Sequence, residues 1–262
     1  MLPETFWGRI QYLLQQYGAS FLSGAGNTMI IAIVGTFLGC LIGFIVGIIQ
    51  TIPVDKRDSA VKKTLVGFLK FIMACYVEFF RGTPMMVQAM FIYYGSAYLF
   101  NINMSMWFAA FFVVSINTGA YMAETVRGGI LSVDEGQTAA KAIGMTHVQT
   151  MMNVILPQAL RNIMPQIGNN LIINIKDTCV LSIIGIVELF YTTKGVAGAY
   201  YTYFESFTIA MVMYFILTFV CSRLLRLLEH KMEGPQNYDL ATTDTLAHTS
   251  GLYSYPKKKE EK

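Results

Sequence analysis

Two long stretches without charge dominate this sequence. No Asp, Glu, Lys or Arg occurs between Arg9 and Asp55, or between Arg81 and Glu124. A helix of about 20 apolar residues crosses the hydrocarbon core of a bilayer, and each stretch is long enough to contain one. Over the whole chain 13% of residues are charged, against about 25% in soluble domains. The chain is therefore expected to be an all-helical integral membrane protein.

The first predicted span covers residues 28–52 and stops at Pro53. Small residues recur along one of its faces every four positions, at Gly35, Gly39, Gly43 and Gly47. Such a stripe lets another helix approach closely. The loop that follows, residues 53–64, holds more basic than acidic residues. By the positive-inside rule this loop is cytoplasmic, so the N-terminus is expected outside.

Residues 1–27 do not read as a cleaved signal peptide, because they contain Glu4 and Arg9 and lack a basic start followed by a short apolar run. Apolar side chains recur there at helical spacing, opposite glutamines. Two interpretations stay open. The preferred one is an amphipathic helix in the membrane interface, and the other is a polar lead-in to the first span.

Residues 65–100 are too long for one straight span, at about 1.5 Å of helix per residue, and short for two. Pro84 removes a helical hydrogen bond and disfavours helix at Thr83. We predict a single crossing interrupted at residues 81–84. The rival is a hairpin of two short spans.

Three further spans are predicted over residues 104–123, 163–189 and 207–228. Five crossings place the Lys-rich loop, residues 128–153 and the C-terminus in the cytoplasm, in agreement with the basic residues there, whereas a hairpin at residues 65–100 breaks this agreement. The transmembrane domain thus covers residues 28–230. Residues 231–262 are too polar to fold alone and are expected to form a disordered cytoplasmic tail.

Nothing in the sequence indicates an enzyme. It lacks a phosphate-binding G-x-x-x-x-G-K-[ST] loop, an H-E-x-x-H pair and a G-x-S-x-G turn. Its three histidines are scattered and its four cysteines have no metal-ligand spacing, so no metal site or bound cofactor is expected. The net charge of +3 comes from loop residues that indicate topology, and no nucleic-acid partner is expected.

One cytoplasmic segment resembles a known motif. Residues 138–144 read T-A-A-K-A-I-G, and V-I-L-P follows nine residues later. This resembles the EAA loop of bacterial ABC-importer permeases, E-A-A-x₃-G-x₉-I-x-L-P, with Thr138 in place of the glutamate and Val154 in place of the isoleucine. Residues 78–84 with Gln88, residues 156–161 and residues 175–178 are similar to further stretches of the polar amino acid uptake family. The resemblance covers about residues 28–228.

The resemblance implies a five-span permease subunit of a binding-protein-dependent ABC importer in the bacterial cytoplasmic membrane. Residues 138–144 would form a coupling helix that docks on a cytoplasmic ATPase subunit, which uses ATP-Mg. Further implied partners are a second permease subunit, an extracytoplasmic binding protein, membrane lipid and a polar amino acid as solute. The residues assigned to coupling are Glu135 (a substitute for the missing glutamate), Thr138, Ala139, Ala140, Gly144, Leu156 and Pro157. Gly144 permits a sharp turn after the helix.

Charged and amide side chains at membrane depth are the candidates for the solute path, because their burial there is costly without a cavity or partner. An amino acid needs acceptors, donors and charges of both signs. Residues that supply them are Glu78, Arg81, Asn117, Asn174, Lys176, Asp177 and Thr178, and the family motif adds Thr83 and Gln88. The structural alternative is that Glu78 and Arg81 simply pair with each other, and that Lys176 and Asp177 lie near an interface.

Two other functions compete. An ion-coupled carrier or channel would work without an ATPase, but would leave the single coupling motif without a partner to serve. A membrane scaffold would only recruit partners, and would have no use for charged groups at membrane depth.

Overall fold

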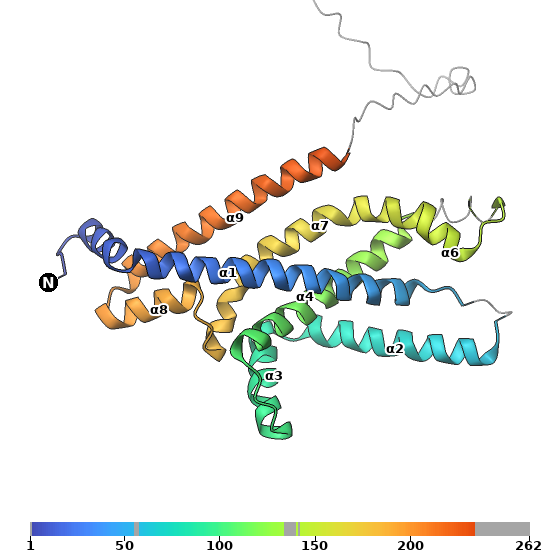
Figure 1. Ribbon diagram of the computed structural model, residues 1–262, viewed down its shortest axis with the longest axis horizontal. Coiled ribbons are helices and arrows are strands. Elements are labelled where there is room, and N and C mark those ends of the chain that lie inside the picture. Colours follow the sequence, from blue (N-terminus) through green and yellow to red (C-terminus); the bar gives the residue numbers. More distant parts are fainter. Residues whose placement is uncertain (1, 55–57, 134–139, 141, 234–262) are drawn as a thin grey trace, which may run out of the picture. The chain divides into compact units, whose positions relative to one another are not determined.

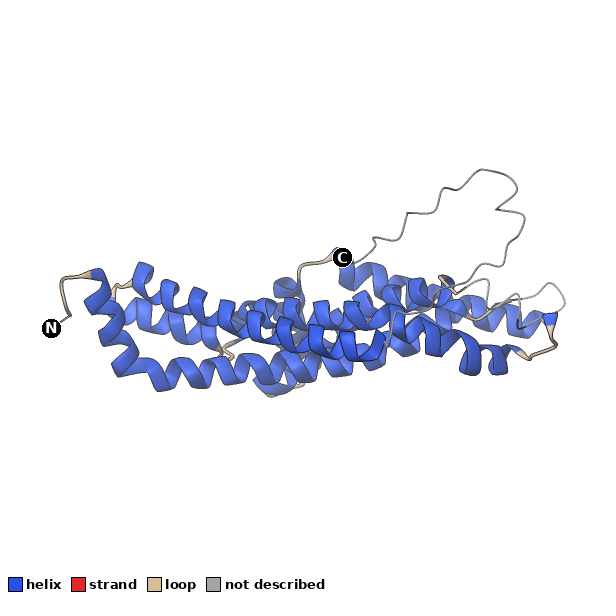
Figure 2. Ribbon diagram, turned by 90° about the horizontal axis from the view of Figure 1, so that it is seen from above, coloured by secondary structure: helices blue, strands red, loops and turns tan. Residues whose placement is uncertain are grey.

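The computed structural model describes residues 2–54, 58–133, 140 and 142–233, with only the backbone of residues 229–233. The regular elements of these residues are all helical. In chain order they are α1 (Phe6–Thr51), α2 (Ala60–Gly82), α3 (Met85–Phe100), α4 (Met106–Leu131), α6 (His147–Thr150), the π-helix η1 (Met151–Ile155), α7 (Leu156–Asp177), the 3₁₀-helix η2 (Thr178–Ile184), α8 (Leu189–Tyr200) and α9 (Tyr203–Glu233). Helix α1 packs along α4, and α2 and α7 each contact this pair; Figure 2 shows helices and no strand among the described residues.

Helix α1 is continuous from Phe6 to Thr51, so no break in the helix marks the predicted boundary at residue 27. Its N-terminus is capped by Thr5, whose Oγ1 accepts a hydrogen bond from the Gly8 amide at 3.2 Å. Arg9 then pairs with Glu205 of α9 at 3.0 Å. The first turns of α1 are thus tied to α9, and an interfacial position for residues 1–27 stays a prediction.

The glycine stripe of α1 forms the contact with α4, which confirms that it lets a helix approach closely. A Cβ atom added to each glycine would meet α4 at under 3 Å, at Val114, Thr118, Met122 and Val126 in turn. At Gly43 the added atom would lie 2.3 Å from the Met122 Cβ. Absence of side chains at these positions therefore sets the distance between the two helices.

The predicted interruption is present between α2 and α3, and α3 turns away sharply from the direction of α2 (Figure 1). Helix α4 is longer than its predicted span and continues past Glu124 to Leu131. The predicted fourth span corresponds to α7 with η2. Beyond it the chain bends by 56° into α8, which has no counterpart among the predicted spans.

Three of the described helices are long and apolar enough to cross a membrane, namely α1, α4 and α9, and the bent pair of α6–η2 with α8 is a fourth candidate. Helix α2 is not among them because Lys70, Glu78 and Arg81 interrupt its apolar sequence. The chain is thus a multi-pass membrane protein, and the count of five crossings stays a prediction.

Candidate functional site

The break between α2 and α3 is built by Pro84. Thr83 before it is extended, with φ −119° and ψ 144°, as expected for a residue that precedes proline. Because Pro84 has no N–H, the Phe80 carbonyl four residues earlier loses its helical donor. The side chains of Gln88 and Asn117 replace that donor, at 2.9 and 3.3 Å. Two amides therefore satisfy the backbone that the proline frees.

Gln88 holds the break together from α3. It is 3% exposed, and its Nε2 also donates to the Thr83 carbonyl at 2.9 Å and the Thr83 hydroxyl at 2.8 Å. Its Oε1 accepts from Asn117 of α4 at 3.0 Å. One buried amide thus fixes the α2–α3 break against α4.

A second polar contact joins three helices. Asn174 of α7 donates to the Thr36 hydroxyl of α1 at 2.7 Å and to the Thr118 hydroxyl of α4 at 2.9 Å. All three side chains are buried. Since hydrogen bonds between helices fix their register in an apolar surrounding, this contact places α7 against the α1–α4 pair.

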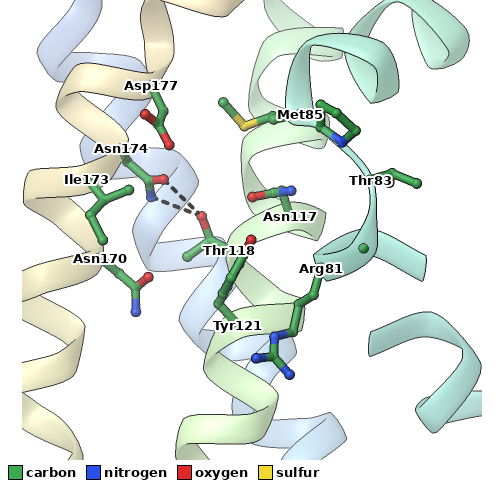
Figure 3. Close-up of a pocket in the computed structure, with 12 residues that line it drawn as sticks. Arg81, Thr83, Met85, Asn117, Thr118, Tyr121, Asn170, Ile173, Asn174 and Asp177 are labelled. Atoms are coloured by element: carbon green, nitrogen blue, oxygen red, sulfur yellow. Dashed lines mark hydrogen bonds between the residues drawn. The ribbon is translucent and has the colours of Figure 1, made fainter. Parts of the chain in front are cut away.

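Between the break, α4 and α7 lies a cavity of about 510 Å³ (Figure 3). Such a volume falls within the range of small-molecule sites, roughly 300–1,000 Å³. The groups that line it and bear charge, amide or hydroxyl are Arg81, Thr83, Asn117, Thr118, Tyr121, Asn170, Asn174 and Asp177. Asp177 comes from α7 and Arg81 from α2, so opposite charges stand on different walls. The cavity therefore offers donors and acceptors for a zwitterion.

The Arg81 guanidinium has two neighbours on α4. It forms an ion pair with Glu124, and it lies 5.6 Å from the ring centre of Tyr121, in a cation–π arrangement. Glu124 also meets Arg127 at 3.5 Å. Arg81 is thus held at the edge of the cavity by α4.

On the other side of this ion pair lies a smaller hollow of about 290 Å³, between α1, α2 and α4. Its polar lining consists of Gln50, Lys70, Glu78, Glu124 and Arg127. Glu124 belongs to this hollow while its partner Arg81 belongs to the cavity. The pair therefore stands between the two spaces.

The structure brings together five of the residues predicted for the solute path at the cavity wall: Arg81, Thr83, Asn117, Asn174 and Asp177. Gln88 lies behind them and supports Thr83 and Asn117. Others lie elsewhere. Glu78 lines the smaller hollow, Lys176 is exposed outside the cavity lining, and Thr178 is buried and donates to the Ile175 carbonyl at 3.0 Å.

The alternative that Glu78 and Arg81 pair with each other is wrong, because Arg81 turns to Glu124 of α4. No ion pair of Glu78 occurs among the described residues.

The polar cavity residues missing from the sequence prediction are Thr118, Tyr121 and Asn170. A sequence signal exists for Asn170 and Tyr121, but not for Thr118. Asn170 lies one helical turn before Asn174, and Tyr121 lies one turn after Asn117. Polar side chains spaced by four within apolar spans share one helix face, so the known member of each pair points to the other.

Part of the predicted coupling segment, including Glu135, Thr138 and Ala139, lies outside the described residues. Of the described part, Ala140 is 3% exposed and Ile143 is 79% exposed. Gly144 has φ +83°, and the Met145 amide donates to the Ala140 carbonyl at 3.1 Å. This is the hydrogen bond of a glycine-terminated helix end, so the predicted sharp turn at Gly144 is present.

Downstream of this turn, Thr146 and Gln149 form a capping box, and the π-helix η1 leads into α7. Helix α7 begins at Leu156 and follows η1 without a break, so Pro157, which has no N–H, removes a helical donor at the junction of the two elements. Leu156 packs against the cluster that joins α1, α4 and α7. Contact of this region with an ATPase stays a prediction.

Comparison with known proteins identifies the family. The family described as "Binding-protein-dependent transport system inner membrane component" matches residues 59–234. The chain is 34% identical over 215 residues to the glutamine transport system permease protein GlnP of Escherichia coli (strain K12), covering 81% of this chain and 92% of that protein.

Solved structures agree with this match and with the predicted fold class. The crystal structure of an amino acid ABC transporter with histidines has a chain 34% identical to this one, with a TM-score of 0.73, over 83% of this chain and 96% of that one. An inward-facing MetNI methionine ABC transporter shares the fold at 19% identity, with a TM-score of 0.64 over 81% and 95%. The chain therefore belongs to the family of inner membrane components of binding-protein-dependent transport systems, the permease subunits of ABC importers.

Proposed function

We propose that this chain is the membrane-spanning subunit of an importer that moves a polar amino acid across the bacterial cytoplasmic membrane, driven by ATP hydrolysis on separate subunits. The observation that carries the proposal is the cavity of about 510 Å³, which has opposite charges and three amides on its walls although one of these walls belongs to the apolar helix α4. Polar groups at membrane depth are retained where they line a path or bind a solute.

The cavity lining matches the parts of an amino acid. The Asp177 carboxylate suits the ammonium group, and the Arg81 guanidinium suits the carboxylate, which it binds through paired N–H donors. The amides of Asn117, Asn170 and Asn174 suit a polar side chain. Glutamine is the first solute to test, because relatives of this chain are named for glutamine transport.

The distribution of basic residues supports an orientation in the membrane. The C-terminal end of α1 and the N-terminal ends of α2 and α7 lie at one end of the helix bundle (Figure 1). Because the sequence between α1 and α2 is rich in Lys and Arg, we infer that this end faces the cytoplasm and that the N-terminus lies outside. A solute delivered by an extracytoplasmic binding protein would then enter from the opposite end.

The coupling segment is the proposed contact with the ATPase. Ile143, almost fully exposed beside the Gly144 turn, offers an apolar side chain to a groove on that subunit. Movement of the docked segment would pass through η1 into α7, whose Asn170, Asn174 and Asp177 line the cavity. A second permease subunit, the same or similar, would complete the path.

Transport by the reconstituted complex tests this proposal. The permease, its co-purifying ATPase and its binding protein are placed in liposomes, and uptake of labelled glutamine is measured with and without internal ATP. Uptake is expected to need ATP and the binding protein. It is expected to fail in Gly144→Asp, which adds a charge and a strained residue to the turn, but to persist in Gly128→Asp, an exposed glycine of α4 with open space around it.

Three outcomes would contradict the proposal. Uptake that continues without ATP and stops when ion gradients are dissipated would establish an ion-coupled carrier. Uptake without ATP that simply equilibrates the solute would establish a channel. A chain that binds partners but moves none of the twenty amino acids would be a scaffold.

A further inference from the structure

The Arg81 side chain has an unusual set of neighbours for a cation in a solute cavity. Its charge is paired with Glu124, which lines the smaller hollow, and its guanidinium also lies over the Tyr121 ring at 5.6 Å. An aromatic face attracts a cation without neutralising it. Tyr121 can therefore keep Arg81 in place while its anionic partner changes.

Glu124 has a cation on each of its two oxygens. Oε2 meets the Nη1 of Arg81, and Oε1 lies 3.5 Å from the Nη2 of Arg127. If Arg81 leaves, Glu124 keeps Arg127 and is not left as an unpaired charge. The group of three contains one anion and two cations, so a carboxylate that joins it brings the charges into balance as two pairs.

We propose that Glu124 is a positioning residue that holds Arg81 at the cavity while the protein is empty and releases it to the carboxylate of the solute. Glu124 then stays with Arg127. This inference rests on the proposed function, because it requires a solute with a carboxylate to enter the cavity.

The partial exposure of these side chains lowers the free-energy cost of breaking the ion pair between Arg81 and Glu124. The side chains of Arg81, Glu124 and Arg127 are 37%, 42% and 43% exposed and line the cavity or the smaller hollow, where water that fills these spaces screens their charges. Ion pairs of this exposure couple by a factor of about five or less. Glu124 is therefore a weak competitor that the solute can displace, and it lowers affinity by a similar factor.

Binding to charge variants tests the exchange. Labelled glutamine is bound at equilibrium to the purified permease–ATPase complex in lipid nanodiscs, without the binding protein, and compared with the carboxamide of glutamine, which keeps the ammonium but lacks the carboxylate. Glu124→Gln is expected to tighten glutamine binding about two- to fivefold, because the competitor is gone, and not to tighten binding of the carboxamide.

The two variants Glu124→Gln and Arg127→Gln should change glutamine affinity in opposite directions, which would not be expected if both residues only supported the fold. Arg127→Gln is expected to weaken glutamine binding about two- to fivefold, since Glu124 then depends on Arg81 alone. Lys70→Gln is the matched control: it removes the same charge from the same hollow, but Lys70 makes no ion pair with Glu124 among the described residues. It is expected to leave binding unchanged. Glu124→Asp keeps the competing charge and is expected to bind like the wild type.

Two results would overturn the exchange alone while wild-type uptake stays normal. One is unchanged or weaker glutamine binding in a folded Glu124→Gln complex. The other is equal weakening by Arg127→Gln and Lys70→Gln, which would show a general effect of charge. A wild-type complex that neither binds nor accumulates glutamine in the presence of ATP would overturn the proposed solute, and the exchange with it.

Discussion

Replacement of Gly43 by alanine tests the packing on which the cavity depends. The added Cβ atom would lie 2.3 Å from the Met122 Cβ and 2.9 Å from the Ala123 backbone nitrogen. Carbon atoms pack best at about 3.5–4.0 Å, so the shortfall exceeds 1 Å. The Met122 Cβ and the Ala123 nitrogen are fixed by the backbone of α4, so they cannot move away by rotation about a side-chain bond. We therefore expect α1 and α4 to be forced apart.

The cost can be worked out from this geometry. Overpacking of a close contact costs about 1–3 kcal/mol, and the obstacles here are backbone atoms and the Met122 Cβ, which is fixed to the backbone, so we take the upper half of that range. Alanine in place of glycine within a helix raises the free energy of unfolding by about 0.5–1 kcal/mol through its better helix propensity. The free energy of unfolding is therefore expected to fall by roughly 1–2 kcal/mol in Gly43→Ala. Gly26→Ala, on the same helix with nothing within 4 Å of its Cβ position, should gain about 0.5–1 kcal/mol.

The assay is unfolding of the purified protein in mixed micelles by increasing fractions of SDS, for the wild type and both variants. Gly43→Ala should unfold at a lower fraction than the wild type, and Gly26→Ala at an equal or higher one. If both variants are equally stable, the glycine stripe does not set the distance between α1 and α4, and the packing argument is refuted.

Three other substitutions have defined outcomes. Gln88→Leu leaves the Thr83 carbonyl without its amide donor and should lower the free energy of unfolding by about 1–3 kcal/mol in the same SDS titration. The control is Gln158→Leu, at an exposed glutamine beside a helix proline, which should change the free energy of unfolding by under about 0.5 kcal/mol. Asn174→Leu leaves two buried hydroxyls without their amide partner, so the free energy of unfolding should fall by roughly 1–2 kcal/mol and glutamine uptake should be abolished. Normal uptake by this variant would contradict the place of Asn174 in the solute path. Gly144→Ala adds a Cβ to a residue with left-handed backbone conformation, which costs about 1–2 kcal/mol of strain. The variant should reduce the stimulation of the partner's ATPase activity by solute-loaded binding protein. Full stimulation would contradict a role for this turn in coupling.

The features that the sequence predicts correctly depend on local geometry. A proline without an N–H and the restricted residue before it end α2 wherever the chain lies, so the break at Thr83 and Pro84 follows from residue identity alone. Glycines spaced by four define a face before any partner is known. Both predictions need only the chain within one helix.

The ends of the helices are harder to predict because they depend on partners. Charged Glu124 and Arg127 mark the predicted end of the third span, but helix α4 continues past them to Leu131. Arg81 of α2 pairs with Glu124 and so removes the penalty for an unpaired charge at that point of α4. Hydropathy counts the charge and does not see its partner.

The composition of the cavity is only half predictable for the same reason. Amides at Asn117 and Asn174 stand out in apolar spans, but whether they meet depends on the register between helices far apart in sequence. Asn174 contacts Thr36, a residue that by sequence is an ordinary polar member of the first span. Glu78 and Arg81, close in sequence, end in different spaces.

Accessibility of the cavity to water and to solute tests whether it belongs to the solute path. The four native cysteines are first changed to alanine, and Ile173 is then replaced by cysteine. Ile173 lines the cavity with an apolar side chain, so its replacement removes no hydrogen bond. Reaction of the new thiol with a small charged reagent is then timed in the reconstituted complex, with Phe215→Cys on the exposed apolar face of α9 as the control. We predict a reactive thiol at position 173, an unreactive one at 215, and slower reaction at 173 in the presence of an amino acid that the complex transports. A thiol at 173 that does not react, or that reacts at the same rate with and without the transported amino acid, would contradict the assignment of this cavity to the solute path.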